Sequence, residues 1–437
     1  MRLWSIAAYL LLPYAVVGLI WRGLRYPAYW RRWPERFGFM RPVRGERVVW
    51  VHAVSVGEVR SSAPLVRAIA DRLPRHRILV TTMTPTGSEQ VAKLFGERVL
   101  HRYLPYDTPD AVARFLDRIR PELAIIAETE FWPNLFHACV RRGIPLHIVN
   151  ARMSLSSFRA YLLAGRAVRS MFASADLICA QTSLDAQRLR NLGVDDRLLT
   201  VTGNLKFDVE PPATVAEEAR QLRRQWGESR PVLIAASTHQ GEETRILTAF
   251  ADLRQRYRDL LLVLVPRHPE RFSTVARLCR RRGFTAARRS MHSGDLPAAV
   301  SVVVGDTMGE LHRLYAASDV AIIGGSFVRH GGQNPLEACM VSVPVIFGPH
   351  MFHFEEISAL TLERGAGRQV PDAAALVDAV ALYLDQPELR RAAGRSARAL
   401  IEDNHGSLEA TLAAMSRQLA STAAAAGRVE DAADSPA

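Results

Sequence analysis

The sequence alternates between short apolar runs and amphipathic helical stretches, and it does so in two consecutive series. The first series predicts strands at Val48–His52, Ile78–Thr82, Val99–Leu104, Leu123–Ala127, Leu146–Val149, Leu177–Ala180 and Leu199–Thr202. The second predicts strands at Val232–Ala236, Leu261–Val265, Val300–Val304, Val320–Ile323 and Val345–Phe347. Strands that alternate with helices form parallel, doubly wound sheets. We therefore predict two Rossmann-like α/β domains, and 437 residues are enough to give each domain its own core.

The limits of these domains follow from changes in composition. The stretch "FDVEPPATVAEEARQLRRQWGESRP" combines a proline pair with many charges, which is typical of an interdomain connection plus one helix. We predict an N-terminal domain at residues 47–208 and a C-terminal domain at residues 209–420. Residues 421–437 are poor in apolar side chains that could form a core and are predicted to be a disordered tail. Ligands of such sheets bind beyond the carboxyl ends of the strands, so the cleft between the domains is the expected site.

The N-terminus has a different character. Residues 3–21 contain no charge, and a stretch of 19 uncharged, mostly apolar residues can just cross a bilayer core of about 30 Å. Residues 22–47 carry eight arginines and two glutamates. The bulky, basic flank argues against cleavage of a signal peptide, and the positive-inside rule leaves the rest of the chain in the cytoplasm. We predict a membrane anchor at residues 1–21 and a basic juxtamembrane segment at 22–46, although Pro13 also permits a helix that lies in the membrane surface.

The sequence lacks the motifs of several common classes of enzyme and metal site. No Gly-x-Gly-x-x-Gly follows the first strand and no Gly-x-x-x-x-Gly-Lys-Ser/Thr is present, which argues against NAD dehydrogenases and P-loop ATPases. The four cysteines form no Cys-x-x-Cys pair and are expected to be buried, reduced thiols. His350 and His353 stand three residues apart without a third metal ligand nearby, so we expect a structural or ligand-facing role and no metal.

Acidic residues follow two of the strands of the first series. Glu58 in "VHAVSVGEVR" lies where a helix begins, and Glu128 and Glu130 follow the apolar run "LAII". An acid at a helix start is stabilised by the helix dipole, which needs no function. A carboxylate that faces a cleft can instead act as a general base, and the small residues around Glu58 leave room for a substrate. Both interpretations stand for Glu58, and a capping or loop hydrogen bond is as good an explanation for Glu128.

Other candidate residues lie at the domain junction and in the second series. Lys206 in "GNLKFD" is one of only two lysines, and its position favours a charge in the cleft over a solvated side chain. "VPRHPERF" places Arg267 and His268 directly after a strand, and "VGDTMGELHRLY" predicts a helix starting near Met308. A helix start suits a phosphate. The glycine-rich "GGSFVRHGGQNPLEA" leads into a helix with Glu337, an acid that can hold ribose hydroxyls.

Seven motifs in order resemble one family. "HAVSVGE", "ETEFWPNL", "NARMS", "GNLKFD", "PRHPERF", "GGSFVRHGGQNPLEA" and "GPHMFHF" look like those of 3-deoxy-D-manno-octulosonic acid (Kdo) transferases, and the resemblance covers residues 1–420. It implies a GT-B fold and transfer of Kdo from CMP-Kdo to a lipid A precursor at the cytoplasmic face of the bacterial inner membrane. It implies no cofactor and no nucleic-acid partner. Phe131 and Gln333 depart from the family pattern without affecting a central position.

The resemblance also assigns residues. It implies that Glu58 is the catalytic base and that Glu130 and Lys206 stabilise the transition state. The implied CMP-binding residues are Arg267, His268, Met308, Gly309, Glu310, Asn334, Pro335, Leu336 and Glu337. One base without a protein nucleophile implies single displacement with inversion at an oxocarbenium-like carbon. Two alternatives remain: a nucleotide-sugar epimerase, which needs no membrane anchor, and a non-catalytic nucleotide-sugar binder, which needs no base.

Overall fold

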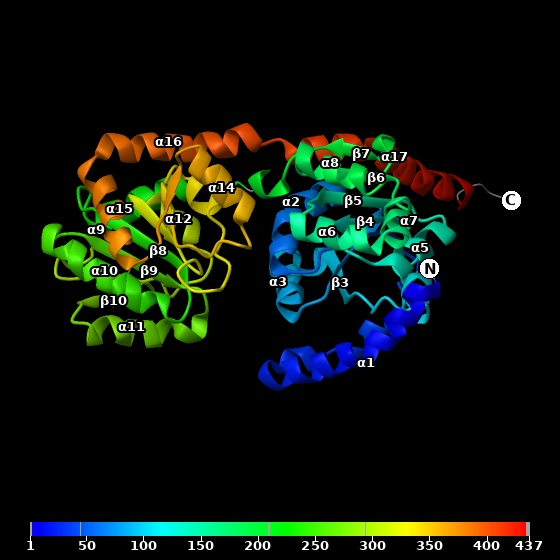
Figure 1. The fold of residues 1–437 in the computed structure, drawn as a ribbon, viewed down its shortest axis with the longest axis horizontal. Helices are drawn as coiled ribbons and strands as arrows, with labels where there is room; N and C mark the ends of the chain where they lie inside the picture. The colour runs from blue at the N-terminus through cyan, green and yellow to red at the C-terminus, as the bar shows by residue number, and fades with distance from the viewer. Residues whose placement is uncertain (1, 44, 209, 293, 434–437) are drawn as a thin grey trace. The chain divides into compact units, whose positions relative to one another are not determined.

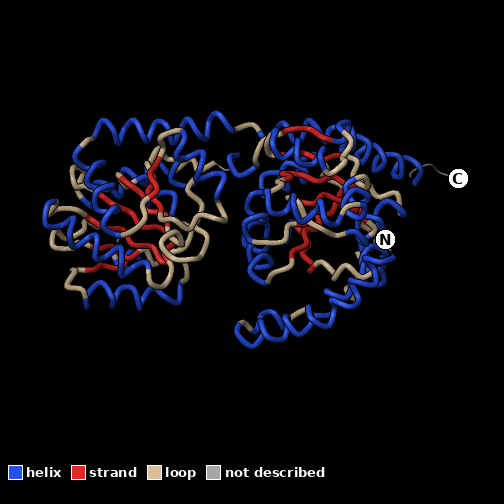
Figure 2. Tube along the Cα trace, in the orientation of Figure 1, coloured by secondary structure: helices blue, strands red, loops and turns tan. Residues whose placement is uncertain are grey.

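The computed structural model describes residues 2–43, 45–208, 210–292 and 294–433. The chain divides into two compact units (Figure 1). The N-terminal unit comprises Met1–Val209 together with His405–Ala437, and the C-terminal unit comprises Glu210–Asn404. In each unit, helices cover both faces of a sheet (Figure 2). This is the doubly wound architecture that the alternating sequence predicts.

The N-terminal unit is built on a seven-stranded parallel sheet with the strand order β3-β2-β1-β4-β5-β6-β7. Its strands are β1 (Arg47–His52), β2 (His76–Thr82), β3 (Val99–Tyr103), β4 (Pro121–Ala127), β5 (Leu146–Ala151), β6 (Leu177–Ala180) and β7 (Leu199–Val201). Its helices are α1 (Arg2–Arg25), α2 (Val56–Arg72), α3 (Pro85–Phe95), α4 (Pro109–Ile119), α5 (Pro133–Arg141), α6 (Leu155–Ala164), α7 (Arg166–Phe172), α8 (Ser183–Asn191) and α17 (Ser407–Ala433). Short 3-10 turns include η1 (Pro27–Trp30), η2 (Trp33–Phe37) and η5 (Leu205–Asp208).

The order of the strands fixes where a ligand site can form. After β3, the chain crosses back over the sheet, and β4 pairs with β1 on the side opposite β2. The direction of winding thus reverses between β1 and β4, and the loops at their carboxyl ends diverge to leave a crevice. Apolar residues of β1 and β4 are buried on both faces of the sheet, which explains their near-continuous apolar runs.

The C-terminal unit has a second seven-stranded parallel sheet, with the order β10-β11-β9-β8-β12-β13-β14. Its strands are β8 (Val232–Thr238), β9 (Leu261–Pro266), β10 (Ala286–Arg288), β11 (Val302–Val304), β12 (Val320–Ile323), β13 (Val345–Phe347) and β14 (Gly367–Gln369). Its helices are α9 (Val215–Trp226), α10 (Glu242–Arg256), α11 (Phe272–Arg281), α12 (Leu311–Ala316), α13 (Leu336–Cys339), α14 (Glu355–Glu363), α15 (Ala373–Asp385) and α16 (Pro387–Asn404). Here the winding reverses between β8 and β12, so the crevice lies beyond those two strands.

Every predicted strand is present, with ends shifted by at most two residues. The sequence analysis missed β10 and β14, the two edge strands of the second sheet. Their sequences, "AAR" and "GRQ", are short and lack a run of large apolar residues. An edge strand is paired on one side only and needs less apolar surface, so its sequence carries a weaker signal.

The C-terminal limit of the second domain differs from the prediction. Residues 405–420 belong to the N-terminal unit, because α17 packs on it through the buried Leu412, Met415 and Leu419. The Asp208 carboxylate accepts hydrogen bonds from the backbone amides of Gly406 (2.7 Å) and Leu408 (2.5 Å), which fixes the start of α17. The helix continues to Ala433 through much of the predicted tail, consistent with the high helix propensity of alanine. Residues 434–437 lie outside the described part of the chain.

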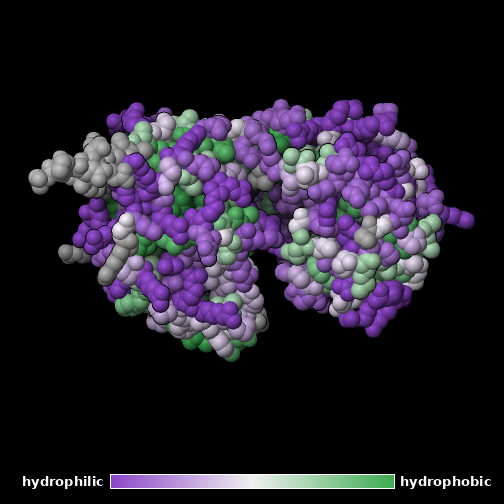
Figure 3. All heavy atoms as spheres, turned by 180° about the vertical axis from the view of Figure 1, so that it is seen from behind, coloured by the Kyte–Doolittle hydropathy of each residue, from purple (hydrophilic) through white to green (hydrophobic). Residues whose placement is uncertain are grey.

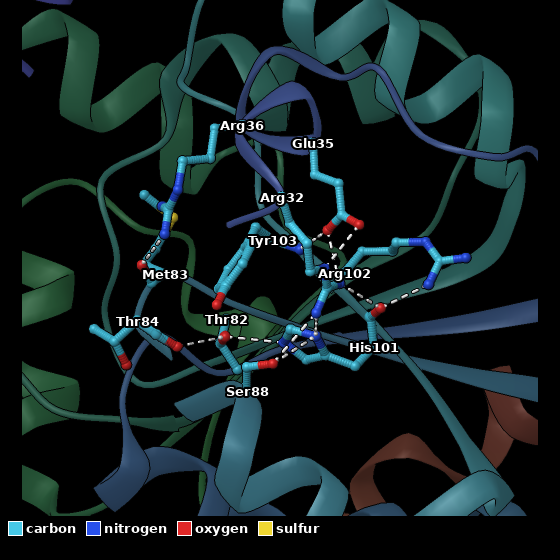
Figure 4. Close-up of polar contacts among 10 residues, drawn as sticks. All are labelled: Arg32, Glu35, Arg36, Thr82, Met83, Thr84, Ser88, His101, Arg102 and Tyr103. Carbon is cyan, nitrogen blue, oxygen red and sulfur yellow. Dashed lines mark hydrogen bonds and ion pairs between the residues drawn. The ribbon is translucent and has the colours of Figure 1, made fainter. Parts of the chain in front are cut away.

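The segment predicted to be juxtamembrane is part of the N-terminal unit. Arg36 is buried with 2% exposure and donates to the Met83 carbonyl at 3.0 Å (Figure 4). Arg32 forms a two-pronged ion pair with Glu35, whose carboxylate also accepts from the Tyr103 amide at 2.9 Å. These contacts bind η2 to the carboxyl end of β3. Both arginines are therefore occupied within the protein, which the charge count of the sequence could not indicate.

Helix α1 is attached to the N-terminal unit at both ends. Residues Trp4–Leu24 are long and apolar enough to cross a membrane, by length and composition. Near the start of the helix, the Trp4 indole donates to Asp107 (2.8 Å) and the Tyr9 hydroxyl donates to Asp110 (2.7 Å). Just beyond its end, the Tyr26 hydroxyl donates to Glu89 at 2.9 Å. Figure 1 shows the helix running beside the N-terminal unit between these two attachments.

Candidate active site

Glu58 lies at the crevice between β1 and β4, in the first turn of α2. Ser55 caps this helix by accepting from the Glu58 amide. The Glu58 carboxylate folds back over the same turn, accepting from the Val54 amide (2.7 Å) and the Ser55 hydroxyl (2.9 Å). This arrangement resembles a capping box, and the Ser-x-x-Glu spacing of the sequence carries its signal. The expected helix-start role of Glu58 is therefore present in the local geometry.

The pKa of Glu58 is not the one that a helix-capping role alone would give. A carboxylate with two hydrogen-bond donors at a helix start normally has a lowered pKa. Burial of Glu58, reinforced by the nearby charges of Glu128 and Glu130, instead raises its pKa to about 8. Because an ionised carboxylate loses hydration here and faces two further acids, Glu58 holds its proton near neutral pH. A group with these properties releases and accepts a proton within the physiological range.

Glu128 and Glu130 lie on the loop Glu128–Trp132 between β4 and α5. Glu128 has a positive φ of 60°, an uncommon conformation for a glutamate, and its amide donates to the Val149 carbonyl at 2.9 Å. Burial, and after it the charge of Glu128, raises the pKa of Glu130 to about 7. The charge of Glu128 thus raises the pKa of both Glu58 and Glu130, and the charge of Glu130 also raises that of Glu58.

Lys206 supplies the positive charge of this site. Its ammonium group lies 3.1 Å from the Glu128 carboxylate, and its side chain is only 18% exposed. The 3-10 turn η5 that carries it is held in place by Asn150, whose side-chain oxygen accepts from the Leu205 amide at 3.0 Å. The sequence analysis expected Lys206 at a domain junction. The structure gives it a specific partner within the N-terminal unit, and it is not a solvated lysine.

The site thus combines three carboxyl groups with one ammonium group. With Lys206 beside Glu128, the arrangement can exchange a proton at Glu58 and meet charge that develops in a bound substrate. The sequence analysis counted Ser55 only among the small residues around Glu58 and did not name Asn150; in the structure these two residues position Glu58 and Lys206. It also left out His52 on β1, which is fully buried and whose pKa is lowered to about 3 by that burial. A neutral imidazole therefore lies in the strand that leads to Glu58.

In the C-terminal unit, Arg267 and His268 follow β9, the strand that pairs with β8. The Arg267 amide donates to the Thr238 carbonyl at 3.0 Å, which joins the loops that follow β8 and β9. The ring of His268 lies 5.5 Å from that of His239, which in turn stacks on His330 at 4.3 Å. Burial, with help from the neighbouring histidines, lowers the pKa of His239 to about 4. The structure thus adds His239 and His330 to the predicted pair.

The glycine-rich segment is held by an acid that the sequence analysis missed. Glu242, at the start of α10, is fully buried. Its carboxylate accepts from the amides of Gly325 (2.7 Å), Phe327 (2.9 Å) and His239 (2.8 Å). Burial raises the pKa of Glu242 despite these three donors. Glu242 consequently fixes the loop after β12 against the loop after β8, as a preformed binding site requires.

The residues from Met308 to Glu310 differ from the prediction in one respect. Helix α12 begins at Leu311, so Met308 and Gly309 lie in the turn that precedes it. Gly309 has a φ of 87°, which favours glycine. The Glu310 carboxylate accepts from the Thr307 hydroxyl (2.6 Å) and pairs with Arg289 (3.3 Å) and Arg313. These contacts, more than a helix dipole, hold the turn in place.

Asn334–Glu337 form the start of α13, a helix of four residues. The Asn334 side-chain oxygen accepts from the Leu336 amide at 3.1 Å, Pro335 is the N-cap residue, and Leu336 is buried. Glu337 is partly exposed in the first turn. All the predicted CMP-binding segments follow the strands β9, β11 and β12 and therefore share the carboxyl edge of one sheet.

The residues around His350 and His353 have a packing role. A Cβ atom at Gly331 would lie 2.5 Å from the His353 ring, and one at Gly332 would lie 2.3 Å from the Met351 sulfur. The glycines are thus needed for the loop to approach this segment. Within the described residues, no group of three or more histidine, cysteine or acidic side chains could hold a metal ion. The four cysteines are all buried and free, as the sequence predicts.

Comparisons with known proteins agree with this arrangement. Residues 31–209 match the family described as 3-deoxy-D-manno-octulosonic-acid transferase (kdotransferase), and residues 238–400 match glycosyl transferases group 1. The chain is 40% identical to the 3-deoxy-D-manno-octulosonic acid transferase of Haemophilus influenzae, covering 91% of this chain and 93% of that protein. It is also 40% identical to the enzyme of the same name from Bordetella pertussis, over 87% and 90% of the two chains.

A solved structure supports the fold. UDP-GlcNAc 2-epimerase from Neisseria meningitidis aligns over 85% of this chain and 100% of its own, with a TM-score of 0.57 and 14% identity. At this identity, the likeness concerns the two-domain GT-B fold alone. Coverage and identity to the curated enzymes together give the conclusion: this chain belongs to the 3-deoxy-D-manno-octulosonic acid transferase family and is a glycosyltransferase.

Proposed function

We propose that the enzyme transfers Kdo from CMP-Kdo to a hydroxyl group of a lipid A precursor in lipopolysaccharide biosynthesis, with inversion at the anomeric carbon. The observation that carries the proposal is Glu58, a buried carboxyl group at the switch point of the N-terminal sheet with a pKa raised to about 8. A sugar hydroxyl is a weak nucleophile until a base takes its proton. A carboxylate with a raised pKa is a stronger base than an ordinary glutamate and is still ionised in part near neutral pH.

The remaining charges suit the rest of the reaction. As the hydroxyl oxygen bonds to the anomeric carbon, CMP departs with the bonding electrons, and positive charge develops on the sugar ring. Glu130 can stabilise that positive charge. Lys206, which neutralises Glu128 at 3.1 Å in the free enzyme, can meet the negative charge of the donor carboxylate or phosphate. No covalent sugar–enzyme intermediate is required, because the acceptor oxygen attacks directly, and a single displacement inverts the configuration.

The donor is assigned to the C-terminal unit, and Glu337→Gln tests the assignment. We expect this variant to weaken CMP binding by roughly 10-fold, because a hydrogen bond that involves a charged group contributes more than a neutral one. Isothermal titration of the full-length protein with CMP gives the affinity directly. Glu363→Gln, at the far end of α14, is the control. Equal affinity in wild type and Glu337→Gln would remove Glu337 from the CMP site.

The proposal places the enzyme at the cytoplasmic face of the inner membrane, bound to the membrane surface without crossing it. Helix α1 has 24 residues and is about 36 Å long. If it crossed a bilayer, its first turn would lie on the far side, beyond the reach of Asp107 and Asp110. Its hydrogen bonds to both residues favour a helix that lies in the membrane surface. Figure 3 shows pale and green atoms on this part of the surface. The exposed apolar residues of α1 are Ile6, Tyr9, Leu10, Leu11, Tyr14, Val17, Ile20, Trp21 and Leu24.

Acidic substitutions on α1 should release the protein from lipid. We expect Leu10→Asp with Val17→Asp to weaken binding to phosphatidylethanolamine–phosphatidylglycerol vesicles by at least roughly 10-fold, since burial of each leucine or valine contributes about 2 kcal/mol. Flotation of the vesicles measures the bound fraction. The control is Met291→Asp, which places a charge at an exposed apolar residue of the C-terminal unit. If the double variant floats with the vesicles as wild type does, α1 is not the lipid contact.

Product analysis tests the proposed reaction itself. Purified enzyme with CMP-Kdo and a lipid A precursor should release CMP only when the acceptor is present, and mass spectrometry should find Kdo on the lipid. An epimerase would alter the donor without an acceptor, and a binding protein would release no CMP. Either of those outcomes would contradict the proposal.

A further inference from the structure

Helix α1 does more than contact the surface of the N-terminal unit, because its first turns reach the loop that carries Glu130. The ring of Trp4 meets the ring of Phe131 edge to face, with 4.8 Å between the centroids. On its other side, Phe131 packs against Tyr161 of α6 at 5.6 Å. Phe131 directly follows Glu130 in the chain, so the residue next to a candidate catalytic acid is held between α1 and α6.

The same turns of α1 also contact the start of the following helix. The Asp107 carboxylate accepts from the amides of Asn134 (3.0 Å) and Leu135 (2.9 Å), and thereby caps α5. The Trp4 indole donates to this carboxylate at 2.8 Å, and the Ser5 hydroxyl donates to the Asn134 side chain at 2.8 Å. Asp107 is only 8% exposed, so its partners are not readily replaced by water. The first turns of α1 therefore contact the loop Glu128–Trp132 through Phe131. They also contact the start of α5, the helix that follows this loop, through Asp107 and Asn134.

This loop depends on such contacts. Residues 128–132 belong to neither a strand nor a helix, and Glu128 already has an uncommon positive φ. Without a regular backbone ladder, the position of the loop is determined mainly by how its side chains pack. A small displacement of a catalytic group is enough to lower the rate of a reaction substantially.

We infer that Trp4 is a positioning residue: the first turns of α1 fix the loop Glu128–Trp132, so the seating of the apolar helix on the N-terminal unit and the geometry of Glu130 are coupled. The inference rests on the proposed function for the role of Glu130. It gives α1 a part in catalysis that is separate from lipid binding. An exposed apolar residue of the same unit that lies outside α1 and the candidate site should have no such effect.

The groups that face Glu130 determine how its titration should respond. They are Glu58 of α2, Glu128 on the same loop and Tyr161 of α6, with Lys206 beyond Glu128. Burial is the largest cause of the raised pKa of Glu130, ahead of the charge of Glu128. If the loop loosens when Trp4 is removed, water reaches Glu130, and its pKa should fall from about 7 toward the ordinary value of 4.5.

The test compares Trp4→Ala, Trp4→Phe and Leu184→Ala in the full chain with a lipid A precursor dispersed in detergent, so that binding to a membrane does not limit the rate. We expect Trp4→Ala to lower kcat by roughly 10-fold or more with little change in the KM for CMP-Kdo. The ionisation near pH 7 should shift to lower pH. Trp4→Phe keeps a ring against Phe131 and should recover most of the rate. Leu184→Ala, at a residue of α8 that is 52% exposed, should behave as wild type.

A second measurement does not require activity. Carbodiimide labels accessible carboxyl groups, and peptide mass spectrometry should find Glu130 modified faster in Trp4→Ala than in wild type or Leu184→Ala, at unchanged secondary structure by circular dichroism. A wild-type enzyme that fails to transfer Kdo would overturn the proposed function, while the labelling would still decide the role of Trp4. Equal labelling, or equal kcat and pH profiles in wild type and Trp4→Ala, would overturn the inference.

Discussion

Glu58→Gln is expected to abolish transfer while binding of CMP-Kdo persists. Glutamine keeps the size of the side chain, and its oxygen can still accept from the Val54 amide while its nitrogen donates to the Ser55 hydroxyl, but it cannot take a proton. Loss of a positioned general base lowers turnover by roughly 10²-fold or more. Steady-state kinetics with a lipid A precursor, together with titration of CMP-Kdo binding, measures both parts. Wild-type turnover in this variant would refute the assignment of Glu58 as the base.

The same variant should respond to pH in a way that an exposed acid at a helix start would not. The pKa of Glu58 is raised to about 8 in the folded protein, against 4.5 for an ordinary glutamate. Between pH 4.5 and 8, the folded protein holds a proton that the unfolded chain has released, so the free energy of unfolding falls as pH rises. Glutamine has no such ionisation. The melting temperature of Glu58→Gln relative to wild type should therefore increase from pH 5 to pH 8.

Lys206→Ala should lower turnover by roughly 10- to 100-fold, with a smaller change in the KM for CMP-Kdo. Removing the ammonium group takes away the partner that lies 3.1 Å from the Glu128 carboxylate. If Lys206 meets charge that develops only as CMP departs, its loss affects the chemical step more than the binding of the ground state. Lys206→Arg should recover the activity only in part, since a planar guanidinium does not replace a compact ammonium group in a confined site.

The sequence offers a matched control for this experiment. Lys93 is the only other lysine of the chain, and it is exposed near the end of α3. Lys93→Ala should have wild-type kinetics. A structural role for Lys206 would appear as a lower melting temperature with unchanged turnover, because Glu128 would lose a partner without any effect on chemistry. That outcome would show that Lys206 has a structural role and no role in the chemical step.

Much of the candidate site could be located because its residues stand in sequence where parallel strands end. Glu58 follows β1, Glu130 follows β4, and both strands have apolar runs that identify them. Lys206 could be selected because lysine is rare in a chain that uses arginine for nearly all its positive charge. The residues that support them were harder to find. Glu242 looks like any acid at a helix start, and only its three backbone donors, two of which lie some 80 residues away, reveal its role.

The sequence by itself determined the two α/β units, their strands and the acids and lysine of the candidate site, because strand and helix periodicities are local properties of the chain. The tertiary structure determined the features that depend on contacts between residues distant in sequence. It assigned residues 405–420 to the N-terminal unit, buried Arg36 in a segment that reads as basic and solvated, and brought Lys206 to Glu128, 78 residues away. It also placed Trp4 against Phe131. The raised pKa of Glu58 also depends on the tertiary structure. Its causes are burial and the charges of Glu128 and Glu130, which follow another strand, and no local sequence pattern encodes them.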